Sequence, residues 1–341
     1  MDDFIVLVLP GTQAISAAAT LDLLSAAALL APRHGLPAPR WRVVSPVPGP
    51  VRLSSGLVLE ALPLPRRLPA GRPTWIVPGI GVTNGRRGRA LLAEPPAQAA
   101  MQWLRRAEAQ GACVAASCSG VLLLAGAGLL AGRRATTAWW LASLLRELAP
   151  ACSVDEARMV IEDGNLLTAG AALAQVDLML WLLRRRFGQP LAEALARVML
   201  IDGRQHQSPY IEPAILHAGH ALLARIEAEV RARLPQPTSV QALAEALAMT
   251  PRTLARQVRA ASGRSPLALI QSVRVAHARA MLEGSGLSVE EVAHRVGYGD
   301  ATALRRLMKR SFGATPRQVR GIAGRDAPRA ERALAPTRRG A

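Results

Sequence analysis

One cysteine follows a short apolar run in a pattern that could support nucleophilic chemistry. Residues 112–117 are small and apolar, and Cys118-Ser119-Gly120 then leads into a helical pattern. A sharp turn between a strand and a helix exposes the side chain of the residue at the turn. A cysteine there lies near the helix N-terminus, where the thiolate form is favoured. The same fragment fits a buried structural cysteine equally well. A catalytic thiol would also need an acid or a base beside it.

A second chemical signal is a repeated pattern of basic residues in the last third of the chain. Leu254–Arg259 aligns with Leu304–Lys309 at an offset of 50 residues. Each run leads into a glycine and then a hydroxyl residue followed by proline, at Gly263–Pro266 and Gly313–Pro316. Two copies of a helical unit with basic residues in register predict two equivalent contacts with a periodic polyanion.

Capping residues predict that each copy contains two helices joined by a tight turn. In the first copy Thr238 is the expected N-cap, with Gln241 three residues later, and Thr250-Pro251 begins the next helix. In the second copy Ser288–Glu291 forms a capping box, and Asp300 can cap the helix that follows. Two short helices with a turn between them are the geometry of a helix-turn-helix.

The apolar spacing of each second helix defines an outer face. Leu254 and Val258 are expected to point inward. Residues 266–282 are expected to form a connecting helix that buries Leu267, Ile270, Val273 and Ala280-Met281. The candidate DNA contacts on or beside the outer faces are Arg252, Thr253, Arg256, Arg259, Thr302, Arg305, Arg306 and Lys309. A plain helical bundle with solvated arginines is the alternative, and two registered copies with good caps weaken it.

Composition favours a two-domain protein with an anionic partner. The chain has 341 residues, is 50% hydrophobic and carries a net charge of +18. Residues 1–224 have a net charge of +6, whereas the shorter remainder has +12. Lys309 is the only lysine, so the abundance of arginine reflects a general preference and is weak support by itself.

The cysteines and the N-terminus point to a cytoplasmic protein. Three cysteines, Cys113, Cys118 and Cys152, do not form a disulfide framework. The acidic N-terminus continues directly into a strand pattern, unlike a signal peptide. We found no apolar run of the roughly 18 residues that a membrane helix needs, so no membrane contact is expected.

Strands and helices alternate over the first 200 residues, which predicts an α/β domain with a mostly parallel sheet covered on both faces. The expected strands are Phe4–Leu9, Trp41–Ser45, Leu57–Leu62, Thr74–Val77, Ala112–Ser117 and Met159–Glu162. The expected helices are Leu21–Leu30, Ala97–Ala109, Gly120–Leu130, Leu141–Leu148, Ala174–Arg186 and Leu191–Leu200. We predict domains at 1–200 and 217–320, with a linker at 201–216 and a disordered tail at 321–341.

Residues 238–320 resemble the DNA-binding domain of AraC/XylS-type transcription regulators. The resemblance is carried by Ala248–Arg256, Gly263–Pro266 and Gly297–Asp300, and it covers the whole domain. It implies two recognition helices placed in successive major grooves of double-stranded DNA. Val258 and Met308 stand where the family usually has phenylalanine.

Residues 4–200 resemble the DJ-1/PfpI superfamily, in particular the domain fused to AraC-type DNA-binding domains in GlxA-like regulators. The matching stretches are Pro10–Gln13, Val77–Gly79, Cys118–Gly120, Ala127–Thr137, and Thr168–Gly170 with Asp177. The resemblance implies a flavodoxin-like sandwich that is usually dimeric. It also implies a ligand pocket, for which the candidates are Ser16, Gly79, Cys118, Ser119 and Trp139.

Departures from the superfamily argue against catalysis. Enzymes of this kind set an acidic residue against the cysteine, and Ser16 occupies that position here. Many relatives carry a histidine where this chain has Ala138, and Ile80 replaces a glycine. We therefore expect a non-catalytic sensing or dimerisation domain. The alternatives are a hydrolase, hydratase or glyoxalase-type enzyme that uses Cys118, and an oxidation sensor at Cys118.

Two further features have more than one interpretation. Trp139-Trp140 could form an aromatic wall for a cationic ligand, although such pairs more often serve packing. His206, His217 and His220 do not form a convincing metal site, and no metal or cofactor is expected.

The sequence as a whole predicts a sequence-specific transcription regulator. Its expected partners are promoter DNA, a second copy of the chain, a small-molecule effector, and RNA polymerase if it activates transcription.

Overall fold

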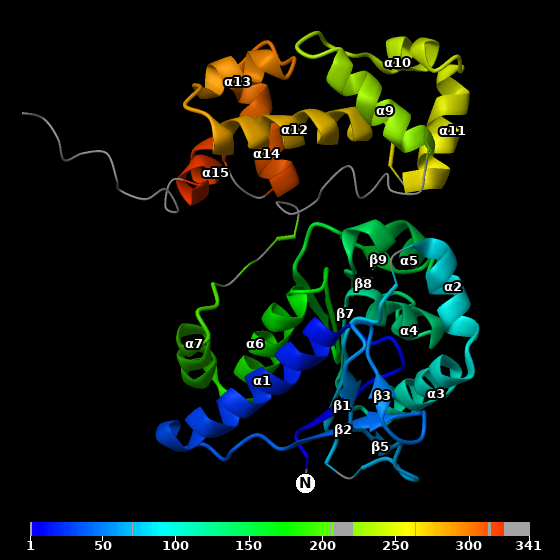
Figure 1. Cartoon of the computed structure of the whole chain (residues 1–341), viewed down its shortest axis with the longest axis vertical. Coiled ribbons are helices and arrows are strands. Elements are labelled where there is room, and N and C mark those ends of the chain that lie inside the picture. Colours follow the sequence, from blue (N-terminus) through cyan, green and yellow to red (C-terminus); the bar gives the residue numbers. More distant parts are fainter. Residues whose placement is uncertain are drawn as a thin grey trace, which may run out of the picture. The chain divides into compact units, whose positions relative to one another are not determined.

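The computed structural model describes residues 2–202 except 70 and 83, then residues 204, 206 and 207, and residues 221–323 except 263, 313 and 314. The side chains of residues 312 and 321–323 are not described. The chain divides into two compact units, residues 1–211 and 212–341, which we call the α/β unit and the helical unit (Figure 1). Most of the predicted linker and tail, His217, His220 and the repeat glycines at 263 and 313 lie outside the described residues.

The α/β unit is built on a seven-stranded sheet with the order β10-β11-β7-β6-β1-β2-β5. The strands are β1 (Phe4–Leu7), β2 (Trp41–Ser45), β5 (Leu62–Pro63), β6 (Thr74–Val77), β7 (Val114–Ser117), β10 (Val160–Asp163) and β11 (Leu166–Ala169). Every neighbouring pair is parallel except β10–β11. This confirms the predicted flavodoxin-like fold with its mostly parallel sheet.

Helices cover both faces of the sheet (Figure 1). Along β1, Phe4 and Val6 are buried in one core cluster, whereas Ile5 and Leu7 are buried in the other, as the two-residue period of a strand requires. The first cluster includes residues of α1 (Ala14–Leu30), α6 (Ala174–Phe187) and α7 (Gln189–Val198). The second includes residues of α2 (Gly85–Ala93), α3 (Pro95–Ala109), α4 (Val121–Gly126) and α5 (Ala142–Leu148).

The segment Ala14–His34 corrects one expectation from the sequence. It is long and apolar enough, at a mean hydropathy of 1.8, to meet the length and composition of a membrane span. In the structure its helix α1 packs against α6 and α7, and Leu24 and Ala27 are fully buried. Its apolar character therefore serves the packing of the α/β unit.

Short elements also differ from the prediction. The single strand expected at 57–62 is two strands, because Val58–Leu59 (β4) pairs with Val51–Arg52 (β3) while β5 joins the main sheet. Neither α2 nor β11 was predicted. A further small sheet pairs β8 (Arg134–Ala135) with β9 (Ser153–Val154), and single 3-10 turns occupy Ala31–His34, Cys118–Gly120 and Trp139–Leu141.

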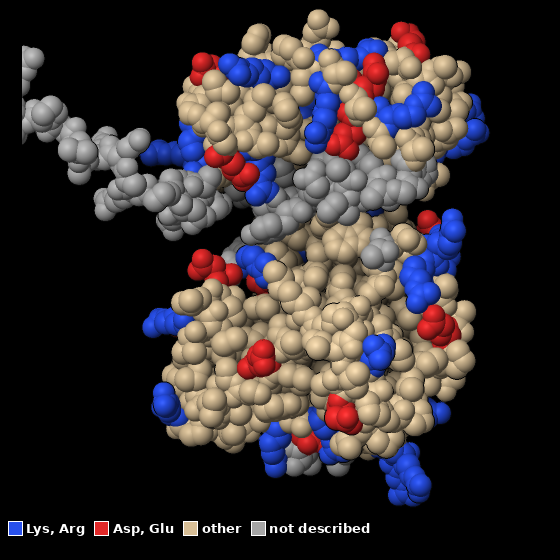
Figure 2. All heavy atoms as spheres, in the orientation of Figure 1, with Lys and Arg blue, Asp and Glu red and all other residues tan. Residues whose placement is uncertain are grey.

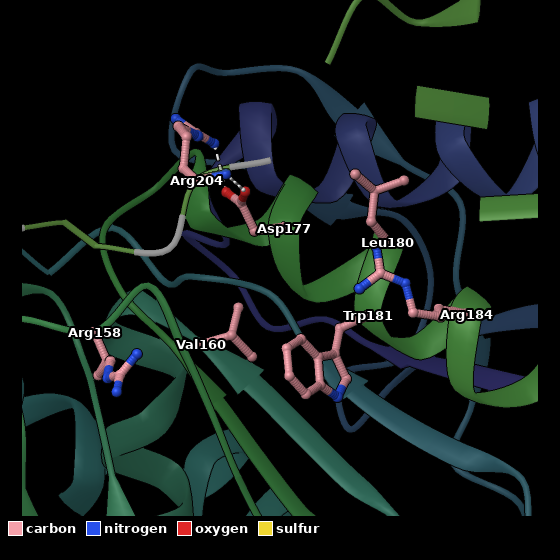
Figure 3. Close-up of a pocket in the computed structure, with 7 residues that line it drawn as sticks. All are labelled: Arg158, Val160, Asp177, Leu180, Trp181, Arg184 and Arg204. Carbon is pink, nitrogen blue, oxygen red and sulfur yellow. Dashed lines mark hydrogen bonds and ion pairs between the residues drawn. The ribbon is translucent and has the colours of Figure 1, made fainter. Parts of the chain in front are cut away.

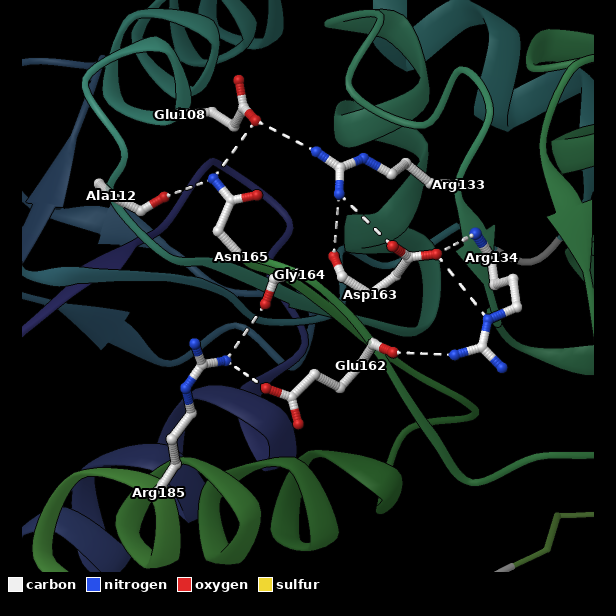
Figure 4. A network of polar contacts seen from close by, with 9 residues as sticks. All are labelled: Glu108, Ala112, Arg133, Arg134, Glu162, Asp163, Gly164, Asn165 and Arg185. Carbon is white, nitrogen blue, oxygen red and sulfur yellow. Dashed lines mark hydrogen bonds and ion pairs between the residues drawn. The ribbon is translucent and has the colours of Figure 1, made fainter.

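A polar network holds the antiparallel β10–β11 hairpin at the edge of the sheet (Figure 4). Arg133 contacts Asp163 at 3.4 Å and Glu108 at 3.7 Å. The Arg134 backbone N–H donates to Asp163 at 2.9 Å, and this bond is the main reason that the pKa of Asp163 lies below its usual value. Ion pairs that water can reach contribute little to stability, so these contacts serve mainly to fix the position of β10.

The helical unit contains the two predicted helix-turn-helix copies. The first is α10 (Val240–Ala246) with α11 (Pro251–Ser262), and the second is α13 (Val289–Arg295) with α14 (Ala301–Phe312). Helix α12 (Pro266–Gly284) connects them, α9 (Ala221–Ala232) precedes them and α15 (Pro316–Ala323) follows. Each copy has its own core cluster, and α12 contributes to both.

Most predicted caps are confirmed. Thr250 Oγ1 accepts from the Thr253 N–H at 3.2 Å, Asp300 accepts from Ala303 at 2.9 Å, and Ser288 forms a reciprocal capping box. The prediction of Thr238 as a cap is wrong, because Ser239 caps α10 instead. The prediction that Leu267 and Ala280 are buried is also wrong, since Leu267 is 53% exposed and Ala280 is exposed as well.

A tight junction between the two copies forms around Gly297. This residue has a φ of +82°, and a Cβ there would lie 2.8 Å from the Pro235 carbonyl oxygen. Arg274 extends from α12 into the same junction, donates to the Gln236 carbonyl at 3.3 Å and places its guanidinium 5.7 Å from the Tyr298 ring centre. The turn of the second copy thus contacts the segment that enters the first.

We predict that Gly297→Ala destabilises the helical unit, because a left-handed conformation costs an L-residue about 1–2 kcal/mol and the Pro235 carbonyl cannot easily move away. The matched control is Gly299→Ala, where no atom lies within 4 Å of the added carbon. Hydrogen exchange of the full chain should accelerate across α13 and α14 in the first variant only. Equal exchange in the two variants would contradict this account of the junction.

Candidate nucleic-acid interface and the cysteine turn

Helices α11 and α14 present matching exposed faces. On α11 the exposed residues include Arg252, Arg256 and Arg259, and at the same three positions α14 carries the exposed residues Thr302, Arg306 and Lys309. A spacing of four and then three residues places these side chains on one face of each helix. The opposite faces are fully buried, through Leu254 and Val258 on α11 and through Leu304 and Met308 on α14.

Two other predicted contacts take part in local structure. Thr253 is half-buried, and its hydroxyl lies 3.0 Å from that of Thr250 at the start of α11. Arg305 forms a 2.8 Å ion pair with Glu290 of α13, in which the two side chains are 51% and 65% exposed. Such an exposed pair is weak, so Arg305 can exchange its carboxylate for a phosphate at little cost.

The connecting helix sets the separation of the two copies. Helix α12 has 19 residues, which corresponds to about 28 Å. Its Leu269 and Val273 are buried with the first copy, and Ala278 and Leu282 with the second. The repeat of the major groove along DNA is about 34 Å, which is of the same order. Figure 2 shows basic side chains on the helical unit, interspersed with acidic ones.

The turn at Cys118 has the predicted geometry of a strand-to-helix elbow. Cys118 follows β7 directly, and its φ of +51° is a strained value for a residue with a side chain. The turn crosses β6 so closely that a Cβ at Gly120 would lie 2.7 Å from the Pro78 carbonyl oxygen. This crossing explains why a glycine follows two residues after the cysteine.

Of the two interpretations that the sequence left open for this turn, the structure corresponds to the buried cysteine. Cys118 is fully buried, and this burial raises the pKa of its thiol to about 11. Hydrogen bonds from the Ser119 and Ala172 backbone and the Ser119 hydroxyl offset the effect only in part. A neutral thiol is a poor nucleophile at physiological pH.

The other pocket candidates of the α/β unit are also closed to solvent. Ser16 is buried, and its hydroxyl lies 3.3 Å from both Gln13 Oε1 and the Ala172 carbonyl oxygen. A Cβ at Gly79 would meet Gln13 Oε1 at 2.4 Å and Cys118 Cβ at 3.1 Å, so these groups form one packed cluster. Ser119 bonds to the Ile80 backbone through its hydroxyl.

Trp139 lies in the core of the α/β unit. Its side chain is buried and meets Trp140 edge to face, with ring centres 4.9 Å apart. This arrangement corresponds to the packing interpretation of the pair. Among the residues that the structure describes, no group of three or more His, Cys, Asp or Glu side chains could hold a metal ion.

Gln207 is a buried polar residue that sequence reasoning missed. Its amide donates to the Thr137 carbonyl at 2.8 Å, to Thr136 Oγ1 at 3.1 Å and to the Arg158 carbonyl at 3.2 Å. Thr137 in turn donates to the Cys118 carbonyl at 2.7 Å. The segment predicted as a linker is thus bonded to the cysteine turn. A single glutamine within an aperiodic stretch carries no signal of such a role.

Comparison with known proteins gives matches in both units. A profile described as DJ-1/PfpI family matches residues 80–185, and one described as helix-turn-helix domain matches residues 243–321. The chain is 28% identical to the HTH-type transcriptional regulator CdhR of Pseudomonas aeruginosa over 96% of this chain and 94% of that protein. It is 31% identical to the HTH-type transcriptional regulator GlxA of Rhizobium meliloti over 65% of this chain and 69% of that protein.

A solved structure described as an AraC family transcriptional regulator from Pseudomonas putida is also similar. It superposes with a TM-score of 0.48 at 22% identity and covers 59% of this chain and all of that one.

We predict that Cys118 resists alkylation in the folded protein, because a buried thiol with a raised pKa is neither accessible nor ionised. Cys152 is only partly buried and serves as the internal control. Timed labelling of the full chain with iodoacetamide at pH 8, followed by peptide mass analysis, should modify Cys152 first and Cys118 only after unfolding in urea. Faster labelling of Cys118 than of Cys152 would show a reactive, accessible thiol.

Proposed function

The chain belongs to the family of HTH-type transcriptional regulators that join a DJ-1/PfpI domain to an AraC-type DNA-binding domain, and we propose that it binds its operator through α11 and α14 in two successive major grooves. The protein is a DNA-binding transcription regulator. The observation that carries the proposed mode of binding is the match between the two exposed faces. Arg256 and Arg306 occupy equivalent positions, and so do Arg259 and Lys309.

Arginine at such positions supports specific recognition. A guanidinium can donate two parallel hydrogen bonds to the O6 and N7 atoms of guanine. We assign base or adjacent phosphate contacts to Arg252, Arg256, Thr302 and Arg306. Arg259 and Lys309 lie further from the helix N-termini and suit phosphate contacts, which add affinity without sequence preference.

For the α/β unit we propose sensing and dimerisation rather than catalysis. The buried neutral thiol and the serine hydroxyl at position 16 support this role, since neither supplies a nucleophile or a base. A second copy of the chain, a small-molecule effector and, for activation, RNA polymerase are the proposed partners. We propose the bacterial cytoplasm as its location, because its DNA partner lies there. The enzyme and oxidation-sensor alternatives both require a reactive Cys118, which labelling tests directly.

We predict that Arg256→Ala and Arg306→Ala each weaken specific operator binding by roughly 1–3 kcal/mol, because each removes a contact to bases or neighbouring phosphates. The operator is first selected from random DNA with the full-length protein. Gel-shift titration at a fixed salt concentration measures the loss. The control is Arg225→Ala, which removes one exposed charge from α9. Losses no larger than that of the control would remove these two residues from the interface.

We also predict that the two half-elements of the operator lie about 10 base pairs apart. Insertion of about five base pairs between them turns one half-element to the opposite side of the DNA and should abolish specific binding. Salt-sensitive non-specific binding should persist, because it depends on phosphates alone. Unchanged protection of the insertion template in a footprint would mean that the two helices do not bind as a coupled pair.

A further inference from the structure

A cavity of about 430 Å³ lies in the α/β unit beside α6, away from the sequence-predicted pocket residues. Figure 3 shows Arg158 and Arg184 on opposite sides of Val160 and the Trp181 ring, with Asp177 and Arg204 joined nearby. The lining residues are Arg158, Val160, Asp177, Leu180, Trp181, Arg184 and Arg204. None of these residues belongs to the DNA-contacting faces.

The cavity carries an excess of positive charge. Asp177 is nearly buried, which raises the pKa of its carboxyl, but Arg204 pairs with it at 2.6 Å. Arg158 and Arg184 are exposed, and neither side chain forms an ion pair with any carboxylate in the described part of the chain. Two guanidinium groups are therefore available to an anion.

The acidic residues around the cavity are held by other partners. Glu162 forms an ion pair with Arg185 and accepts from the Trp181 indole N–H. Asp155, which lines an adjoining hollow with Arg158, accepts from the Ala157 backbone N–H at 2.9 Å. These contacts use the nearby carboxylates within the protein, so they compete weakly with a bound anion.

Trp181 gives the cavity a flat apolar wall. The bond from its indole N–H to Glu162 Oε2, at 3.0 Å, fixes the edge of the ring. The side chain is nevertheless 37% exposed, an unusual amount for a tryptophan of a core-packed helix. Leu180 and Val160 extend the apolar surface beside it. A planar group stacked on this ring would keep an attached carboxylate within reach of an arginine.

We propose that this cavity is the effector site and that it binds a small planar organic anion, such as an aromatic carboxylate. The assignment rests on the proposed sensing role of the α/β unit and names the chemistry that this unit senses. The carboxylate lies between the guanidinium groups of Arg158 and Arg184, and the planar part lies against Trp181. The same positive charge weakens the binding of a neutral or cationic analogue.

The cavity adjoins the segment that leads toward the helical unit. Arg204 lines it, and Gln207 donates to the Arg158 backbone carbonyl. Gln207 also joins this segment to Thr137 and, through it, to the cysteine turn. A ligand that draws Arg158 inward acts on Gln207 through this hydrogen bond, so binding can change how the helical unit engages DNA.

The test uses isothermal titration calorimetry on the full-length protein with 2-naphthoate as the probe and 2-naphthamide as its neutral analogue. We expect saturable binding of one naphthoate per chain and binding of the amide at least about tenfold weaker. Arg158→Gln and Arg184→Gln should each weaken naphthoate binding about tenfold. The control Arg197→Gln, an exposed arginine of α7 outside the cavity, should leave it unchanged. No saturable naphthoate binding, or equal binding by all four proteins, would overturn the site.

The same samples separate this proposal from the proposed function. Gel-shift titration without naphthoate reports operator binding, and failure there would count against the mode of DNA binding and not against the cavity. If the protein binds its operator but shows no saturable binding of naphthoate, only the proposal of the effector cavity is refuted. At saturating naphthoate we expect the operator Kd to change at least about threefold in the wild type and not in Arg184→Gln. An unchanged operator Kd in the wild type would refute the coupling between cavity and DNA.

Discussion

The burial of one helix in two hydrophobic cores determines how the DNA-binding part of this protein is built. Helix α12 buries Leu269 and Val273 in the core of the first helix-turn-helix, and Ala278 and Leu282 in that of the second. Each large apolar side chain contributes about 1.5–3 kcal/mol when buried, more than an exposed ion pair of about 0–1 kcal/mol. The separation of the two recognition helices therefore follows from packing, and the charges on their outer faces are free to serve DNA.

The α/β unit has the backbone geometry of a nucleophile elbow, but the cysteine at that turn is buried. The strained backbone at Cys118 and the close crossing at Gly120 are the features that a nucleophile elbow requires. The thiol itself is buried and neutral, and a serine hydroxyl stands at position 16. The Cys118 carbonyl at this turn accepts a hydrogen bond from the Thr137 hydroxyl, and the Thr137 carbonyl accepts one from the Gln207 amide. The turn thus supports the structure around the segment that leads toward the helical unit.

Charge has different roles in the two units. In the helical unit, exposed arginines at repeated positions suit a polyanion with a regular period. In the α/β unit, Arg158 and Arg184 flank a cavity with an aromatic wall, which suits a single small anion. Arg204 and Gln207 follow α7 in the sequence and precede the helical unit. The side chains of both residues bind groups of the α/β unit. The sensing role that we propose for the α/β unit needs no catalytic step to alter DNA binding.

The sequence by itself determined the features that depend on local chemistry. Capping boxes and apolar periods located both helix-turn-helix copies, because caps and helix faces are set by residues three or four positions apart. Short apolar runs located most of the parallel sheet, although β11 and the split of residues 57–62 were not predicted. Only the tertiary structure decided the burial of Cys118, the exposure of Leu267 and the contacts of Gln207. These depend on which distant segments meet in space, since burial sets the pKa of a thiol and an amide bonds to whatever carbonyls the fold places around it.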